Sequence, residues 1–133
     1  YPVSMEGALK MKEISYVHAE GYAAGELKHG PFALLTPETP VVAICTPGPT
    51  YSVMASNIKE MKARRAPVIA LGVDGDKELA EIVDIFIPIP NTHLLVQILT
   101  ISVTLQLLAY HTACALQRDV DKPRNLAKSV TVE

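Results

Sequence analysis

Lys10 and Glu13 stand three positions apart in a segment whose apolar residues have helical spacing, so they share one helix face. A carboxylate beside an ammonium group stays ionised and can take a proton from a carbon next to a carbonyl or imine. The same spacing also fits a surface ion pair, which contributes well under ~1 kcal/mol. The pair is therefore a candidate for proton transfer, with a solvated ion pair as the alternative.

His29 is a second candidate because Gly30 and Pro31 follow it directly. A histidine in such a turn is held in place and leaves room for a ligand. Imidazole also titrates in the range needed to move a proton on a hydroxyl or ring oxygen. The alternative interpretation is a turn histidine that caps a helix end.

Lys128 is the third candidate and lies in the last fifteen residues, 119–133. This tail has neither helical nor strand periodicity, as is typical of a frayed terminus. However, Lys128 lies among small uncharged residues, with Ala127 before it and Ser129 after it. If the tail packed on the domain, the amine would lose solvent and become a nucleophile or a base.

Helix and strand patterns alternate between these candidates. Unbroken apolar runs at Pro40–Cys45, Pro67–Gly72 and Ile85–Ile89 are typical of strands that are covered on both faces. Helical spacing is found over 5–15, 50–65, 76–82 and 93–116, and a short helix or turn is expected over 25–31.

This alternation predicts parallel βαβ units and a doubly wound α/β sheet, in which ligands bind at the carboxyl ends of the strands. The length of 133 residues suits one domain with a real core. Because the chain begins with a helix pattern, we expect the first strand of the sheet to be missing.

Composition argues against several classes of function. A net charge of −2 does not favour binding to nucleic acid or an anionic membrane. No spacing suggests a metal site, and no Gly-rich or Ser/Thr-rich loop could hold a phosphate or a nucleotide cofactor. Cys45 and Cys114 lie in apolar patterns, so we expect both in the core of a reduced, cytoplasmic protein.

The segment 93–116 approaches the length of a membrane span. Polar residues interrupt it and no basic flank precedes it. We therefore expect a buried helix or a helix at a subunit interface, and no contact with a membrane.

Three segments resemble the glutamine–fructose-6-phosphate aminotransferase family: Glu6–Ser15, Ala23–Pro31 and Asp121–Glu133. The resemblance spans the whole chain and corresponds to the C-terminal end of that family's isomerase half. It implies that residues 1–133, with the tail 119–133, form the second of two sugar isomerase domains. Such a domain is a three-layer, doubly wound parallel sheet flanked by helices.

The resemblance also implies roles for single residues. Glu13 would be the base that moves a proton between C1 and C2 of the sugar, with Lys10 beside it. His29 would assist opening of the fructose ring and reach the site of a neighbouring subunit. Lys128 would form an imine with the open-chain ketose, and Ala127 would contact the substrate.

The implied substrate and product are fructose 6-phosphate and glucosamine 6-phosphate, with no cofactor. The implied partners are a second copy of the enzyme and the rest of the same enzyme, namely its glutaminase domain and the first isomerase domain with its phosphate loop. Without those parts we expect no catalysis. Two alternatives are a related phosphosugar isomerase or fructosamine-phosphate deglycase, and a module that senses sugar phosphates.

Overall fold

The computed structural model describes residues 1–125, and residues 126–133 lie outside the described part. The chain divides into two compact units. One, called here the sheet unit, is Tyr22–Thr100, and the other, the helical unit, comprises Tyr1–Gly21 with the chain from Ile101 onward. The division falls within the last helix.

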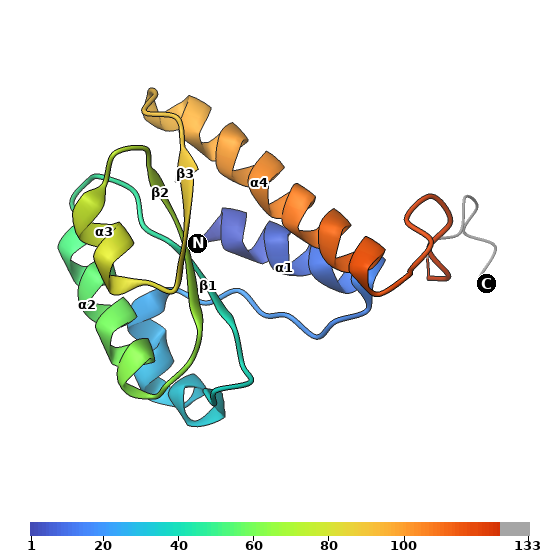
Figure 1. Cartoon of the computed structure of the whole chain (residues 1–133), viewed down its shortest axis with the longest axis horizontal. Coiled ribbons are helices and arrows are strands. Elements are labelled where there is room, and N and C mark those ends of the chain that lie inside the picture. The colour runs from blue at the N-terminus through green and yellow to red at the C-terminus, as the bar shows by residue number, and fades with distance from the viewer. Residues whose placement is uncertain (126–133) are drawn as a thin grey trace. The chain divides into compact units, whose positions relative to one another are not determined.

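The sheet unit contains three parallel strands in the order β1, β2, β3 (Figure 1). They are β1 (Val41–Ile44), β2 (Val68–Val73) and β3 (Ile85–Ile89). All three lie within two residues of the apolar runs that predicted them, so the prediction of an α/β fold with a parallel sheet is confirmed.

Two helices connect these strands: α2 (Tyr51–Ala63) and α3 (Lys77–Ile82). Crossovers between parallel strands are right-handed, so two successive crossovers in one direction place their helices on the same face. Both helices contact β2, and Figure 1 shows them on one side of the strands. Short 3-10 helices η1 (Ala24–His29) and η2 (Pro31–Leu34) precede β1, and η1 contacts α2.

The core of the sheet unit lies between the strands and these helices. Ile58 of α2 and Leu79 of α3 are fully buried in it. A side chain at Gly72 of β2 would place its Cβ 2.4 Å from a methyl carbon of Leu79, so glycine permits this close packing. The buried cluster comprises Leu27, Phe32, Ala43, Cys45, Ile58, Met61, Val68, Ala70 and Leu79.

The helical unit consists of α1 (Pro2–Ser15), the later part of α4 (Leu94–Ala115), and the segments that follow each. Helix α1 begins three residues before the predicted start because Pro2 suits the first turn, where its missing N–H is not needed. The two helices pack closely at Gly7, where a Cβ would lie 2.7 Å from Leu105 Cδ1. The buried stripe of α4 in this unit is Ile101, Leu105, Ala109 and Ala113.

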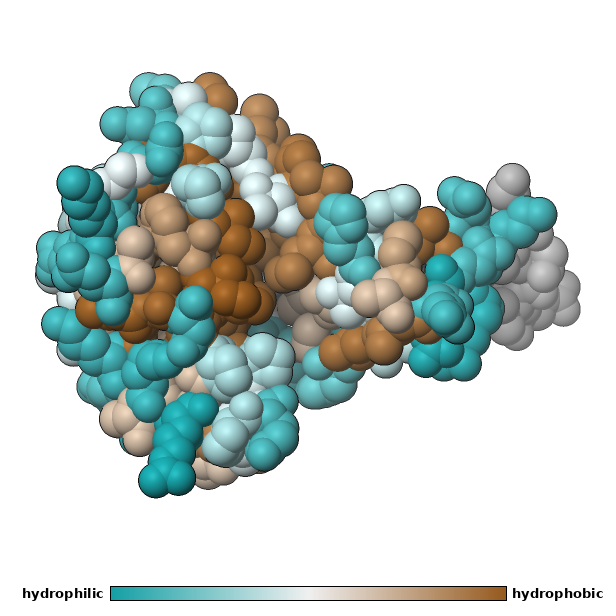
Figure 2. Space-filling model, viewed as in Figure 1, coloured by the Kyte–Doolittle hydropathy of each residue, from teal (hydrophilic) through white to brown (hydrophobic). Residues whose placement is uncertain are grey.

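The predicted burial of the last helix is wrong for most of its surface. Helix α4 is long and apolar enough to cross a membrane, yet only 22% of its most apolar window is buried. Leu95 and Leu99 are about two-thirds exposed, at 67% and 66%, and Figure 2 shows hydrophobic residues on the surface along this helix. Cys114 is also exposed rather than in the core, whereas Cys45 is buried as expected. The alternative of an interface helix stays a prediction.

Candidate functional site

Lys10 and Glu13 form the ion pair that their spacing predicts. Lys10 Nζ donates a hydrogen bond to Glu13 Oε2 at 2.8 Å, and it lies 3.6 Å from Glu6 Oε1. The side chains of Lys10 and Glu13 are 33% and 26% exposed. The pair is therefore half-buried on α1, where both water and a small ligand can reach the carboxylate.

This ion pair also affects the protonation of its lysine. The hydrogen bond to Glu13 raises the pKa of Lys10 above its ordinary value, and the charges of Glu13 and Glu6 act in the same direction. Lys10 therefore stays cationic at neutral pH and places a positive charge beside the Glu13 carboxylate. Among residues 1–125, Lys10 is the sole hydrogen-bond partner of that carboxylate, so lone pairs remain for a proton from substrate.

The end of α1 is fixed by a buried serine next to these residues. Ser15 is 1% exposed, and its hydroxyl donates to the carbonyl of Met11 at 2.6 Å. The same hydroxyl accepts the backbone N–H of Val17 at 3.3 Å. This serine therefore holds the last turn of α1, two residues after Glu13, in one conformation.

His29 is the last residue of η1 in the sheet unit. Its neighbours Leu27 and Phe32 are buried and anchor the turn, while His29 itself is exposed. Gly30 has a φ of 140°, which an L side chain rarely adopts, so glycine allows the turn. The imidazole makes no hydrogen bond with any residue in 1–125, so it does not cap the helix end and its nitrogens are open to a ligand.

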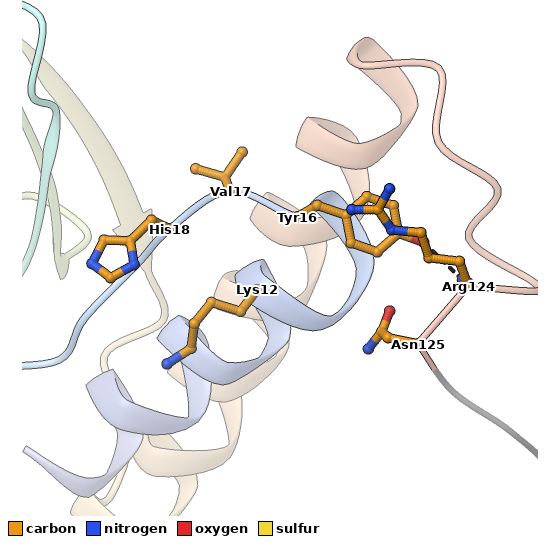
Figure 3. A pocket seen from close by; sticks show the side chains of 6 residues that line it. All are labelled: Lys12, Tyr16, Val17, His18, Arg124 and Asn125. Atoms are coloured by element: carbon orange, nitrogen blue, oxygen red, sulfur yellow. Dashed lines mark hydrogen bonds between the residues drawn. The ribbon is translucent and has the colours of Figure 1, made fainter.

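Lys128 and Ala127 lie outside the described residues, so their predicted roles stay predictions. The structure does describe the chain leading to them, in the helical unit. There a cavity of about 410 Å³ is lined by residues from the end of α1 and from the tail. Figure 3 shows the side chains that line it: Lys12, Tyr16, Val17, His18, Arg124 and Asn125.

Tyr16 joins these two segments. Its hydroxyl oxygen accepts the backbone N–H of Arg124 at 2.9 Å. The guanidinium carbon of Arg124 lies 4.2 Å from the centre of the Tyr16 ring, and that of Arg118 lies 5.5 Å away. Sequence reasoning missed this contact because the partners are 108 positions apart and no local pattern links them.

A second cavity of about 370 Å³ lies in the sheet unit at the start of α2. Next to it, the Tyr51 hydroxyl donates to Asp76 Oδ1 at 3.0 Å, and the same oxygen accepts the N–H of Leu79 at 2.9 Å. Burial, with a smaller contribution from the charge of Asp76, raises the pKa of the Cys45 thiol to about 11. Cys45 therefore stays a thiol at neutral pH and does not serve as a nucleophile.

No group of three or more His, Cys, Asp or Glu side chains within residues 1–125 could hold a metal ion. The described residues offer two separate sets of groups for chemistry: a carboxylate and an ammonium group on α1 of the helical unit, and an exposed imidazole in the sheet unit.

Comparison with known proteins agrees with the sequence resemblance. The isomerizing glutamine–fructose-6-phosphate aminotransferase of Methanosarcina acetivorans is 62% identical over the whole chain, which covers 22% of that protein. The solved C-terminal domain of glucosamine-fructose-6-phosphate aminotransferase from Francisella tularensis superposes with a TM-score of 0.81 at 39% identity. That match covers 90% of this chain and 34% of the other.

A second solved structure represents a different activity on the same fold. Glucosamine-6-phosphate deaminase from Thermotoga maritima matches with a TM-score of 0.75 at 31% identity, over 96% of this chain and 36% of that one. The chain spans about a fifth of the length of the curated relatives it matches. Residues 1–116 match the SIS domain, and the chain therefore belongs to the SIS domain family.

Proposed function

We propose that this chain is the second isomerase domain of a glutamine–fructose-6-phosphate aminotransferase. The observation that carries the proposal is the Lys10–Glu13 pair, in which the carboxylate lies beside an ammonium group, is accessible and has no other partner in the described chain. The 62% identity to a relative with that name supports the same choice.

In this proposal His29, Lys128 and Glu13 divide the reaction between them. The exposed imidazole of His29 assists opening of the fructose 6-phosphate ring. Lys128 Nζ then attacks C2 of the open ketose, and water leaves as the imine forms. Ammonia displaces the lysine, Glu13 takes a proton from C1, and the proton is returned at C2 to give glucosamine 6-phosphate.

The rest of the enzyme is part of the same proposal. Because the chain covers 22% of its relative, a glutaminase domain that supplies ammonia and a first isomerase domain that holds the phosphate belong to the remaining chain. We also propose that two copies associate and that His29 serves the site of the neighbouring copy. The isolated chain should then bind fructose 6-phosphate poorly, and a micromolar affinity by calorimetry would contradict this division.

The direct test is Lys128→Ala in the complete enzyme. Formation of glucosamine 6-phosphate should be lost, while glutamine hydrolysis remains measurable because a separate domain carries it. Lys122→Ala is the matched control, since Lys122 is an exposed lysine of the same tail. Near-normal product formation by Lys128→Ala would refute the role of this lysine.

The related activities are distinguished by the same assay. A phosphosugar isomerase or a deglycase would act without glutamine, and a sensing module would bind sugar phosphate without turning it over. The observation that favours the synthase over a sensor is the accessible Glu13 carboxylate beside Lys10, because binding alone needs no proton-transfer base.

A further inference from the structure

The backbone of Tyr16 has an unusual conformation for its residue type. Tyr16 caps the C-terminus of α1 with φ 62° and ψ 17°, in the left-handed region. Helices commonly end with a residue in this conformation, but it is usually glycine, because a side chain is strained there. A tyrosine at this position suggests that its side chain has a use that outweighs the local strain.

The contacts of the Tyr16 side chain all lead to the chain after α4. The hydroxyl accepts a hydrogen bond from the backbone N–H of Arg124. The guanidinium groups of Arg124 and Arg118 make cation–π contacts with the ring. Between these arginines, Asp119 Oδ1 accepts the N–H groups of Asp121 and Lys122, both at 3.0 Å. The segment 118–124 is therefore a compact turn whose two ends meet one aromatic ring.

The position of this contact matters because of what lies on either side. Glu13 is three residues before Tyr16, about one helical turn or 5 Å along α1. Lys128 is four residues after Arg124, and four extended residues reach at most about 14 Å. Fixing Arg124 to the end of α1 therefore shortens the length of chain between a fixed point and Lys128 to four residues.

We propose that Tyr16 is a positioning residue that anchors the base of the C-terminal tail to the end of α1 and so raises the rate at which Lys128 meets the sugar carbonyl. This inference rests on the proposed function, in which Lys128 forms the imine. Without the anchor, the nearest fixed point is Arg118, whose backbone N–H donates to the carbonyl of Ala113 at 2.9 Å, ten residues before Lys128.

The size of the effect follows from the length of the tether. Effective concentration falls roughly as the −3/2 power of tether length, so a change from four to ten residues lowers it about fourfold. The anchor does not touch the sugar in this proposal, so the loss should appear in kcat and in the rate of imine formation rather than in KM.

Tyr16→Gly is the decisive variant, made in the complete enzyme. It deletes the ring and the hydroxyl, yet glycine suits a φ of 62°, so the end of α1 should not weaken. Imine formation is measured by reduction with borohydride in the presence of fructose 6-phosphate. The Lys128 amine bonds to C2 with loss of water, hydride reduces the C=N bond, and the stable secondary amine is located by mass spectrometry.

We expect Tyr16→Gly to label Lys128 and to turn over about 3- to 5-fold more slowly than the unaltered enzyme, with KM for fructose 6-phosphate within twofold and an unchanged melting temperature. Tyr16→Phe keeps the ring and loses only the bond to the Arg124 N–H, so it should recover part of this loss. Lys122→Ala, which leaves the anchor intact, should label at the normal rate.

The outcomes separate the two proposals. Labelling of Lys128 in the unaltered enzyme together with equal labelling in Tyr16→Gly overturns the anchor and leaves the proposed function standing. A raised KM or a lowered melting temperature without a change in kcat would show a merely structural role and also overturns the anchor. Absence of any label on Lys128 in the unaltered enzyme overturns the imine itself.

Discussion

The helical unit and the sheet unit each contain a lysine paired with a carboxylate, and the two pairs differ in what else the carboxylate binds. In the sheet unit, Asp84 bonds to Lys62 through Oδ1 and accepts the backbone N–H of Val68 through Oδ2 at 2.7 Å. In the helical unit, Glu13 meets Lys10 alone within the described chain. A carboxylate tied to backbone supports the fold, whereas one held only by a lysine is available for chemistry.

The two units also differ in how they are packed. The sheet unit contains the whole buried cluster, including Ile58 and Leu79. The helical unit buries small residues such as Ala109 and Ala113, and its Lys10–Glu13 pair is partly exposed. Substitutions in the core of the sheet unit should therefore change stability. Substitutions of the Lys10–Glu13 pair in the helical unit should change reactivity.

The strongest test of this contrast is Glu13→Gln in the complete enzyme. The amide keeps the size of the side chain but cannot take a proton, so exchange of the C1 and C2 protons with solvent should fall by about 10²- to 10⁴-fold. The melting temperature should stay the same, because the ion pair is partly exposed. Glu6→Gln is the control on the same helix, and unchanged exchange in Glu13→Gln would clear Glu13 of the proposed role.

Ile58→Ala tests the opposite side of the comparison. Ile58 is fully buried, so its truncation leaves a cavity and should lower the free energy of unfolding by about 2–5 kcal/mol. Denaturant unfolding of the chain measures this change. A loss below about 1 kcal/mol would mean that the sheet unit does not depend on its core in the way the buried cluster indicates.

Asp84→Asn should act on the fold in a pH-dependent manner. The hydrogen bonds from Lys62 and from the Val68 N–H hold the pKa of Asp84 below its ordinary value of 3.8. Because the folded-state pKa is the lower one, the stabilisation is complete well above pH 4 and is lost as the pH falls through the lowered pKa.

Melting curves between pH 7 and pH 2 check this expectation. The unaltered chain should melt at a higher temperature than Asp84→Asn at pH 7, and the difference should shrink toward pH 2. A difference that is constant over this range would exclude the ionised form of Asp84 as its cause.

Leu99→Ala should have the smallest effect on the chain by itself. Leu99 is 66% exposed, so its truncation removes little buried surface and should change the free energy of unfolding by less than about 0.5 kcal/mol. The same denaturant assay applies, with Ile58→Ala as the sensitive reference. A loss as large as that of Ile58→Ala would show that the exposed face of α4 is covered when the chain is folded alone.

The sequence predicted the strands well because each is an unbroken apolar run between turn residues, and a strand covered on both faces has that composition. It predicted the Lys10–Glu13 contact for a similar reason, since helical spacing alone brings the two together. These features depend on local pattern, which a single sequence contains in full.

Two other features could not be predicted in this way. The exposure of α4 depends on which of its apolar faces packs against other residues. A packed face and an exposed face of this helix have the same apolar composition, so the sequence does not distinguish them. The contact between Tyr16 and Arg124 joins residues that are 108 positions apart, and a tyrosine after a helix gives no sign of it. The tail residues Ala127 and Lys128 were predicted from resemblance, and that prediction still awaits the experiments above.

The left-handed conformation of Tyr16 has a consequence for how variants of this chain would fare under selection. A library sorted only for folded, abundant protein should accept glycine or asparagine at position 16 readily, because both relieve the strain at φ 62°. A library sorted for growth that depends on amino-sugar synthesis should keep tyrosine. Selection for folded protein would then favour glycine or asparagine over tyrosine at position 16, whereas selection for growth would favour tyrosine.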